Sequence, residues 1–586
     1  MPMTRKLFFI HFILFLLLGL FLYLSDVLTI RSTFVHLFYA VVIFCVFFSL
    51  WSISILLKSK ALHYLIVFLY YNYLFLVYVL FALGKENLGV PMTLKMIYPY
   101  FENFSMLSNL ISYSKLILLL IGYVLIFGLV FYYWNISYKT IGDRKLPKVK
   151  LNSRAKGLGL LSTMLICYFL FSSNYLIEKF KGHQINEPYL TLIYFDEAFN
   201  RQKEKGEENL LAFEKYESPV GNKKNVILII CDALRPDFFQ SEERLTPFID
   251  SLLSTPEFIA HKNMYSTSAF SFNGISNILS SSRELYQNNF FIHDVLKKKG
   301  YDINFMLSGD MTNFWNLKGH IKTESVDSYS DGYENFKYGR SRNLNDDKTN
   351  ILDRLNKLKP YDDVPSFFYF HMMSVHQVGH LDEKKERFKT GGIDLSSTDF
   401  DQQLLINDYK NRMIQLDEYI RILFSILKRK NYLDDYVLVI TSDHGQSLGE
   451  NGIYFHSKYL NYESIKIPFI INYSKAVDTN AITSQLDIAP TILDALDLKV
   501  PNTWKGKAIS DSIPKTIYQT QGDYYSMIWK QQAKTYQLHF DKKSNIYNLF
   551  NISPESKNKH KDIIAQWNQK DLDSLKKLLI SNFNLN

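Results

Sequence analysis

A short apolar run that ends in metal-binding side chains is the feature that most constrains this fold. Val437–Thr441 is aliphatic and β-branched, and Ser442–Gly445 follows it at once. Such a run is typical of a strand buried on both faces of a sheet. In open α/β sheets, functional groups gather beyond the carboxyl ends of the strands. Asp443 beside His444 at that edge predicts half of a divalent-metal site. The plainer interpretation is a capping aspartate and a surface histidine.

The same pattern occurs about 200 residues earlier in the chain. Asn225–Cys231 is a second buried run, and Asp232 follows it directly. Because parallel strands bring their carboxyl ends to one edge of a sheet, we expect Asp232 to lie beside Asp443 and His444. Two half-sites that meet in this way favour metal binding over the plainer interpretation.

From Asn225 onward, short apolar runs alternate with helical patterns. This alternation predicts an α/β domain with a largely parallel sheet. Further strands are expected at residues 303–307, 367–371 and 469–471. Residues 404–430 repeat apolar side chains on one helical face and predict a long amphipathic helix.

The two motifs resemble those of the alkaline-phosphatase/sulfatase superfamily, within its membrane-anchored bacterial branch. That branch includes phosphoethanolamine transferases, lipoteichoic-acid synthases and the inner-membrane sulfatase-like PbgA/YejM proteins. The resemblance covers roughly residues 225–555 and is also carried by residues 485–494 and 541–555, with Asp487 read as structural. It implies a sulfatase-type α/β domain over residues 225–586, preceded by a linker at 178–224.

The first third of the chain predicts a five-helix membrane domain over residues 1–177. A bilayer crossing takes about 20 apolar residues. Five apolar runs reach this length, at residues 7–24, 33–57, 61–83, 116–134 and 157–177. Lysine and arginine gather before the first run, between the second and third, and between the fourth and fifth. These segments are cytoplasmic by the positive-inside rule if the N-terminus is inside, and five spans then place the residues after about 178 on the external side of the membrane.

Composition narrows the compartment and the partners. The net charge of +9 is modest and gives no indication of nucleic-acid binding. Three cysteines are too few for a disulfide scaffold, and each lies in an apolar run as a packed thiol. With the resemblance, this predicts a multi-pass protein of the bacterial inner membrane, with a cytoplasmic N-terminus and a periplasmic or extracellular domain.

The linker contains a charged stretch, residues 195–208, that predicts an exposed helix. Arg201, Lys203 and Lys205 are placed to meet anionic lipid headgroups. The PbgA/YejM proteins carry a basic lipid A-contacting segment in this region. Here the basic residues alternate with glutamates, which favours a solvated connecting helix.

The nucleophile is expected between the two metal half-sites. Family members carry a Cys, Ser or Thr there, at the start of a helix, and counting back from Leu279–Ser280 gives Ser271. A helix N-terminus favours an anionic phosphoryl group and an activated hydroxyl. Composition alone does not choose among the many hydroxyls of this segment. Ser268 and Thr267 are therefore reserve candidates, and a capping role for Ser271 is the alternative.

Departures from the sulfatase pattern indicate the chemistry. True sulfatases carry Cys-x-Pro-Ser-Arg, whereas residues 271–275 read Ser-Phe-Asn-Gly-Ile. Sulfatases also pair two aspartates at the first strand end, but Ala233 follows Asp232. Both departures point from sulfate esters toward phosphoryl or phospho-headgroup transfer.

Two histidines are expected to face the substrate. The family places such a histidine at the position of His376, and His456 matches one that follows the Asp-His-Gly motif. Either side chain can stabilise charge on phosphoryl oxygens or protonate a leaving group. His371 and His380 are less well placed in the sequence.

The resemblance implies one divalent metal ion held by Asp232, Ser271, Asp443 and His444. Zinc is the first expectation, and manganese, magnesium or calcium also suits these ligands. The predicted function is a membrane-anchored phospho-headgroup transferase or phosphoesterase that acts on envelope lipids or glycans through Ser271. Its expected partners are membrane lipids such as lipid A, cardiolipin or phosphatidylethanolamine.

Two other functions remain open at this point. A PbgA/YejM-type regulator would sense lipid, control lipopolysaccharide homeostasis and contact a membrane-protein partner. A true sulfatase is disfavoured by the missing modification motif.

The predicted topology can be tested with reporter fusions. A reporter fused after Lys148 should read as cytoplasmic, and one fused after Asn222 should read as external, because five spans separate the N-terminus from the second position. The opposite pair of results would contradict the predicted orientation.

Overall fold

The computed structural model describes residues 213–585 apart from short gaps, together with helix α3 (Lys60–Leu88) and isolated residues between 47 and 136. The gaps are residues 220, 285–289, 313–316, 322, 342, 383, 385, 391–400, 457–458, 512–515 and 557. The chain divides into two compact units, Met1–Arg201 and Gln202–Asn586.

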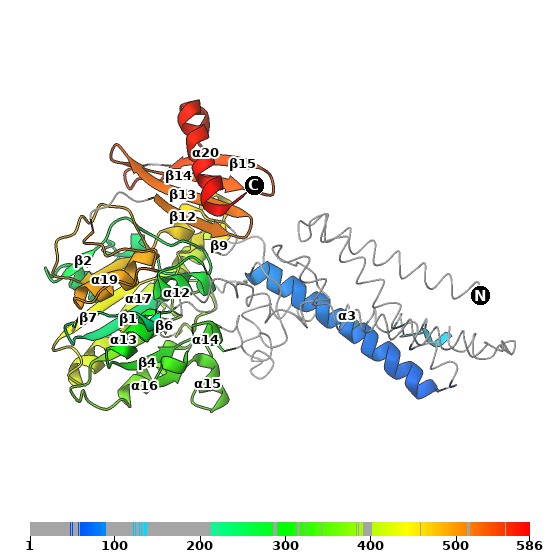
Figure 1. Ribbon diagram of the computed structural model, residues 1–586. Coiled ribbons are helices and arrows are strands. Elements are labelled where there is room, and N and C mark those ends of the chain that lie inside the picture. Colours follow the sequence, from blue (N-terminus) through cyan, green and yellow to red (C-terminus); the bar gives the residue numbers. More distant parts are fainter. Residues whose placement is uncertain are drawn as a thin grey trace. The chain divides into compact units, whose positions relative to one another are not determined.

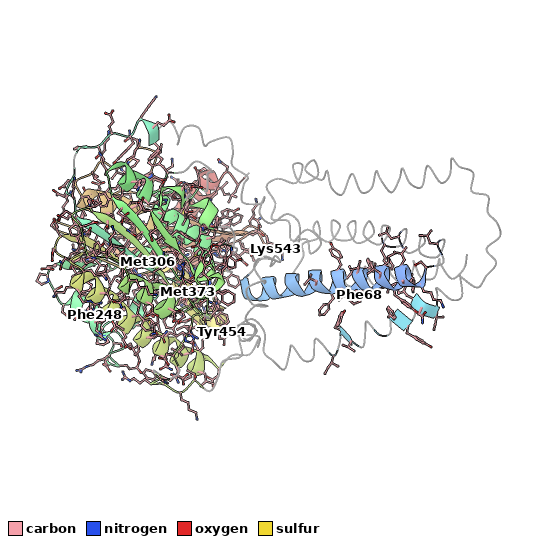
Figure 2. All side chains as sticks on the ribbon, turned by 90° about the horizontal axis from the view of Figure 1, so that it is seen from below. Phe68, Phe248, Met306, Met373, Tyr454 and Lys543 are labelled. Atoms are coloured by element: carbon pink, nitrogen blue, oxygen red, sulfur yellow. The ribbon has the colours of Figure 1, made fainter. Side chains whose placement is uncertain are left out.

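Helix α3 of the first unit contains the predicted span at 61–83, and this segment is helical as expected. Leu65, Phe68 and Leu69 are each about half exposed on its surface, and Figure 2 labels Phe68. The other four predicted spans and the linker helix at 195–208 lie wholly or largely outside the described residues.

None of the helices described in this structure is both long and apolar enough to cross a bilayer.

The second unit is built on a seven-stranded sheet with the order β2-β10-β7-β1-β6-β4-β5 (Figure 1). Strands β7, β1, β6, β4 and β5 are mutually parallel, and β10 runs antiparallel to both of its neighbours. The strands are β1 (Asn225–Cys231), β2 (Phe258–Ala260), β4 (Asp302–Leu307), β5 (Ser328–Ser330), β6 (Ser366–Met372), β7 (Tyr436–Thr441) and β10 (Phe469–Asn472). The sheet is largely parallel, as predicted, with an antiparallel strand near one edge.

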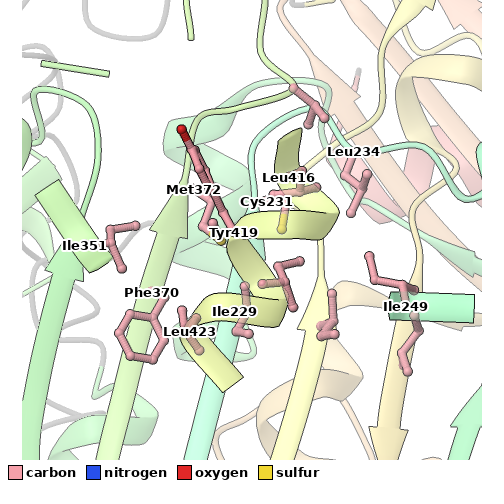
Figure 3. Packing of buried hydrophobic residues seen from close by; sticks show 14 of the residues in the cluster. Ile229, Cys231, Leu234, Ile249, Ile351, Phe370, Met372, Leu416, Tyr419 and Leu423 are labelled. Atoms are coloured by element: carbon pink, nitrogen blue, oxygen red, sulfur yellow. The ribbon is translucent and has the colours of Figure 1, made fainter. Parts of the chain in front are cut away.

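The central strands are buried on both faces, which explains their continuous apolar sequences. Every residue of β1 and of β6 is buried. One face carries Ile229 and Phe370, which pack under Leu416, Tyr419 and Leu423 of α17 (Gln402–Arg429), as Figure 3 shows. The side chain of Asp401 caps this helix by accepting the backbone N–H groups of Gln403 and Leu404.

The opposite face of the sheet is covered by α12 (Ser271–Ser280), α13 (Ile292–Lys298) and α19 (Ile488–Ala495). His293 of α13 contacts Phe305 of β4 edge-on, with ring centroids 5.1 Å apart. The sheet is therefore a middle layer between helices, which is the arrangement that parallel strands require.

A smaller antiparallel sheet follows in the chain and was not predicted from the sequence. It comprises β12 (Thr516–Gln521), β13 (Tyr524–Gln531), β14 (Lys534–Asp541) and β15 (Ile546–Asn551). Helix α20 (Gln569–Phe583) packs on this sheet, where its Leu572 and Leu579 join a cluster with Trp529, Leu538 and Leu549 of the strands. Residues 541–555, which carry part of the family resemblance, form the last turn and strand of this sheet.

The remaining elements are short. They are the two-stranded pairs β3 (Met264–Tyr265) with β11 (Thr483–Ser484) and β8 (Ser447–Leu448) with β9 (Tyr454–Phe455), and the helices α11 (Pro247–Leu253), α14 (Leu317–His320), α15 (Gly332–Lys337), α16 (Asp353–Asn356) and α18 (Tyr462–Ile465).

Several local predictions are confirmed. Each of the five predicted strands is present within one or two residues, and the predicted helix at 404–430 is α17. Cys231 is a buried free thiol, as expected, whereas the other two cysteines lie outside the described residues. Asp487 is structural: its carboxylate accepts the backbone N–H groups of Ser484 and Lys507.

Leu416→Ala should lower the free energy of unfolding of this unit by about 2–5 kcal/mol, because it leaves a cavity between α17 and the sheet. Lys428→Ala, on the exposed side of the same helix, should change it by no more than about 0.5 kcal/mol. Urea unfolding of the full-length chain, followed by tryptophan fluorescence, measures both. Equal shifts for the two variants would contradict this packing.

Candidate active site

Adjacent parallel strands bring the two predicted half-sites together. Strand β1 pairs with β7 so that Ile230 lies opposite Thr441, and both strands end within two residues of this pair. Asp232 follows β1, whereas Asp443 and His444 follow β7. The three side chains therefore leave one edge of the sheet side by side.

The chain turns sharply after Asp232, and the turn is tied to the Asp443 loop. Ala233 has a left-handed backbone with φ of 63°. Its N–H donates to Asp443 Oδ1 at 3.2 Å, and the N–H of Leu234 donates to Ser442 Oγ at 2.9 Å. These two hydrogen bonds fix the loops relative to each other. Asp232 Oδ1 and Asp443 Oδ2 take no part in them.

Asp232, Asp443 and His444 form a buried group with one ligand atom each, and these atoms all lie within 4.8 Å of one another. His444 Nε2 is 3.7 Å from Asp232 Oδ1 and 3.6 Å from Asp443 Oδ2. In the described part of the chain, neither of these two carboxylate oxygens receives a hydrogen bond. Buried carboxylate oxygens without donors and a nearby imidazole nitrogen fit a divalent cation.

The electrostatics of the group also fit a cation. Burial, together with the neighbouring Asp443 carboxylate, raises the pKa of Asp232 well above its usual value. Two carboxylates this close inside a protein disfavour each other's charge unless a positive charge lies between them.

His444 is oriented by its own loop. Its Nδ1 lies 2.9 Å from the carbonyl oxygen of Gly445, which can only accept a hydrogen bond. The hydrogen of the neutral ring is therefore on Nδ1, and Nε2 presents its lone pair to the carboxylates. This is the arrangement in which a histidine binds a metal.

Ser271 lies beside the same group of side chains. It is the first residue of α12, and Phe270 occupies the capping position, so Ser271 does not act as the helix cap. Its Oγ is 3.0 Å from His444 Nε2 and 3.3 Å from Asp232 Oδ2. The start of α12 reaches the metal loop because residue 274 is glycine: a Cβ there would come within 2.5 Å of the Asp443 carbonyl oxygen.

The two reserve hydroxyls have other partners. Thr267 Oγ1 accepts a hydrogen bond from Asn277 at 2.8 Å, and Ser268 Oγ donates to Gln521 Oε1 at 2.7 Å. Neither bond involves the carboxylate group, so the geometry favours Ser271 over both.

His376 and His456 flank the site with opposite hydrogen-bonding character. His376 Nδ1 accepts the backbone N–H of Val378, so the neutral ring carries its hydrogen on Nε2, which lies 3.9 Å from Asp232 Oδ1. His456 Nδ1 lies 2.7 Å from Gln446 Oε1 and donates to it, which leaves the lone pair on Nε2. Burial lowers the pKa of both rings well below the usual value, and His444 adds to the effect on each.

The ring of His456 lies 4.2 Å from that of His444 and 5.0 Å from that of His376, centroid to centroid. The three imidazoles therefore form one cluster beside the carboxylates.

The loop that carries His376 is held rigidly from two sides. Arg412 of α17 donates to the carbonyl oxygens of His376 at 3.2 Å and Gly379 at 2.7 Å. On the other side, the buried Asp347 carboxylate accepts the N–H groups of Met373 at 2.8 Å and Ser374 at 2.9 Å. Sequence reasoning missed both supports because their partners are backbone atoms, which leave no motif.

His371 is closer to the site than the sequence indicated. As part of β6 it pairs with Ile230 of β1, and its Nε2 lies 3.8 Å from Asp232 Oδ2. Its Nδ1 lies 3.2 Å from the carbonyl oxygen of Ser308, so Nε2 again presents a lone pair. The alignment of strand ends could have revealed it, because His371 is the residue that β6 places beside the end of β1. His380, in contrast, is exposed.

A mostly parallel sheet between helices, with carboxylates, histidines and a helix-opening serine at its carboxyl edge, defines the alkaline-phosphatase class of α/β domains. Residues 224–498 match the family model described as sulfatase, and the chain thus contains a sulfatase domain of the alkaline phosphatase superfamily. Residues 449–575 match the model for the C-terminal region of N-sulphoglucosamine sulphohydrolase, which covers the small antiparallel sheet.

Curated relatives are similar over short segments. The N-acetylglucosamine-6-O-sulfatase of Bacteroides thetaiotaomicron is 34% identical over 124 residues, 20% of this chain and 21% of that protein. The phosphatidylethanolamine transferase Mcr-1 of Escherichia coli is 28% identical over 145 residues, 22% of this chain and 26% of that protein. The matched segments thus span about a fifth to a quarter of these relatives.

Among solved structures, the C-terminal periplasmic domain of EptC from Escherichia coli, in complex with Zn, has a TM-score of 0.45 at 15% identity, covering 59% of this chain and 98% of that one. The lipoteichoic acid synthase LtaP from Listeria monocytogenes has a TM-score of 0.42 at 16% identity, covering 58% of this chain and 91% of that one.

Asp443→Asn and His444→Ala should each lower the bound metal per chain strongly, because each removes a ligand while leaving the sheet intact. Asp435→Asn, at a mostly exposed carboxylate, is the matched control and should retain the metal content of the original protein. Elemental analysis of the purified full-length variants measures this. Unchanged metal content in both site variants would show that the metal lies elsewhere.

Proposed function

We propose that this protein is a membrane-anchored, metal-dependent phospho-headgroup transferase or phosphoesterase that acts on envelope lipids or glycans. The observation that carries the proposal is the position of Ser271, whose hydroxyl contacts both Asp232 and His444 at the start of a helix. An activated hydroxyl beside a metal site suits a reaction in two displacements.

In the first displacement, Ser271 Oγ loses its proton and attacks the phosphorus, the bond to the leaving oxygen breaks, and that oxygen gains a proton. The phosphoryl group, with any headgroup that it carries, is then esterified to Ser271. In the second displacement, an acceptor hydroxyl or water loses its proton and attacks this phosphorus, and Ser271 Oγ leaves and is protonated again. Asp232, Asp443 and His444, with the Ser271 oxygen, would hold the metal, which lowers the pKa of the serine hydroxyl and offsets charge on the phosphoryl group. Zinc is the metal that we propose, because it favours sites with a histidine.

His376 and His456 are suited to different roles, because their neutral rings carry the hydrogen on different nitrogens. His376 presents an N–H on Nε2 and is suited to donate a hydrogen bond to a phosphoryl oxygen or to the leaving oxygen. His456 presents a lone pair on Nε2 and is suited to accept the proton of the acceptor hydroxyl. Burial keeps both rings neutral near pH 7. His456 can therefore accept a proton without first losing one.

The phosphoester preference rests on residues 271–275. Position 275, an arginine in the sulfatase motif, is a fully buried isoleucine, and position 274, a serine in that motif, has no room for a side chain. This chain therefore lacks the serine and the arginine of the sulfatase motif Cys-x-Pro-Ser-Arg. The likeness to the phosphatidylethanolamine transferase Mcr-1 supports a phospholipid headgroup as substrate, and the apolar first third supports a position at the membrane.

Ser271→Ala should lower turnover of a phosphodiester substrate about a thousandfold or more, because a covalent mechanism loses its nucleophile. Ser268→Ala is the matched control and should retain most of the activity, since its hydroxyl bonds to Gln521. The assay uses the full-length protein in detergent with phosphatidylethanolamine or a chromogenic diester, and intact-mass analysis reports a phosphoryl adduct.

Three results would contradict the proposal. Full turnover by Ser271→Ala would move the nucleophile to Ser268 or Thr267. Turnover of aryl sulfates in preference to phosphodiesters would assign the protein to sulfatase chemistry. Absence of any turnover, together with complementation of a deletion strain by Ser271→Ala, would favour the lipid-sensing regulator.

A further inference from the structure

A cavity of about 180 Å³ lies apart from the candidate active site in the second unit. It is lined by Arg235, Pro236, Asp237, Tyr462, Glu463 and Lys466. Asp232, Ser271, Asp443 and His444 do not line it. Since a water molecule takes up about 30 Å³, the cavity has room for a small tetrahedral anion. Asp237 is the most exposed of these residues and marks the side that solvent reaches.

The carboxylates of the cavity already have partners on every oxygen. Asp237 accepts two hydrogen bonds from Arg235, at 2.9 Å from Nε and 2.5 Å from a terminal nitrogen. Glu463 bonds through Oε1 to His560 at 3.0 Å and through Oε2 to Asn461 at 2.9 Å. Arg235 is in turn neutralised by Glu450 as well as by Asp237. Each oxygen of Asp237 and Glu463 therefore already accepts one hydrogen bond from the protein.

Among the described residues, Lys466 is the charged side chain of the cavity that has no ion-pair partner. Its side chain is only 8% exposed, and among the described residues its ammonium makes one hydrogen bond, to the carbonyl oxygen of Lys262, and no ion pair. Its Nζ lies 4.4 Å from the ring centroid of Tyr265, whose buried hydroxyl has no hydrogen-bond partner in the same part of the chain. Burial, with nearby Lys559, lowers the pKa of Lys466 to about 7. A buried ammonium with unused hydrogens requires an acceptor.

We propose that this cavity is a second binding site, which takes a small oxyanion such as a phosphate or sulfate group through Lys466 Nζ. The unused hydrogens of the Lys466 ammonium favour an anion, because they can make charge-assisted hydrogen bonds to its oxygens. Lysine suits this role because its ammonium acts as a compact point charge with several donors.

The cavity adjoins the metal loop through backbone contacts. Gly445 donates its N–H to the carbonyl oxygen of Ser464 at 2.9 Å, and a Cβ on Gly445 would come within 2.0 Å of the Glu463 carbonyl oxygen. Arg235 donates to the carbonyl oxygen of Gln446 at 2.9 Å. The proposed anion site therefore adjoins the segments that follow Asp232 and His444.

The test is isothermal titration of sodium sulfate into the full-length protein after metal removal, at about pH 6, where Lys466 is protonated. Without metal, the Asp232 and Asp443 carboxylates repel anions at the first site, so the result does not depend on the proposed catalytic function. We expect one saturable site that is lost in Lys466→Met and retained in Lys466→Arg. Lys262→Met, at an exposed neighbouring lysine, is the matched control and should bind as the original protein does.

A second measurement needs no variant. Sulfate should slow reductive methylation of Lys466 and leave that of Lys262 unchanged, as read by peptide mass spectrometry. Absence of saturable binding by the original protein, unchanged affinity in Lys466→Met, or methylation of Lys466 that is insensitive to sulfate would each overturn the proposal.

Inorganic phosphate and glycerol phosphate distinguish the source of the anion. Binding of glycerol phosphate that is about tenfold tighter assigns the site to an esterified headgroup, and binding of inorganic phosphate that is equal or tighter assigns it to the free anion.

Discussion

The parallel pairing of β1 with β7 is the interaction on which the rest of the site depends. It places Ile230 opposite Thr441 and so makes the chain leave the sheet at Asp232 and Asp443 within one small volume. A shift of this register by one residue would exchange the side chains on the two faces of the strand and would move Asp232 away from Asp443 and His444. The hydrophobic core thus holds two carboxylates together that would otherwise repel each other.

The polar groups at the sheet edge are arranged by backbone atoms. Gly445 and Ser308 carbonyl oxygens orient His444 and His371, and the N–H of Val378 orients His376. Each imidazole therefore presents a defined nitrogen, with a lone pair or a hydrogen, before any substrate arrives. Such preorganisation lowers the cost of arranging charge during a reaction.

Two neighbouring sites favour ligands of opposite charge. Beside Ser271, carboxylate oxygens without donors favour a cation, whereas at Lys466 an ammonium with one acceptor favours an anion. The small residue Gly445 lets the two sites approach, since its backbone touches Glu463 and Ser464 directly.

The sequence by itself predicted the strands, the long helix and the meeting of Asp232 with Asp443 and His444, because apolar runs and the residues that end them are local signals. The resemblance to the family supplied Ser271, His376 and His456 as candidates. Only the tertiary structure decided which histidine presents a hydrogen and which a lone pair, since those assignments depend on backbone partners far along the chain. It likewise brought His371 to the site, formed the antiparallel sheet with α20, and joined Arg235 to Lys466 around one cavity. Residues 235 and 466 lie on separate elements, and no sequence pattern records that packing places them together.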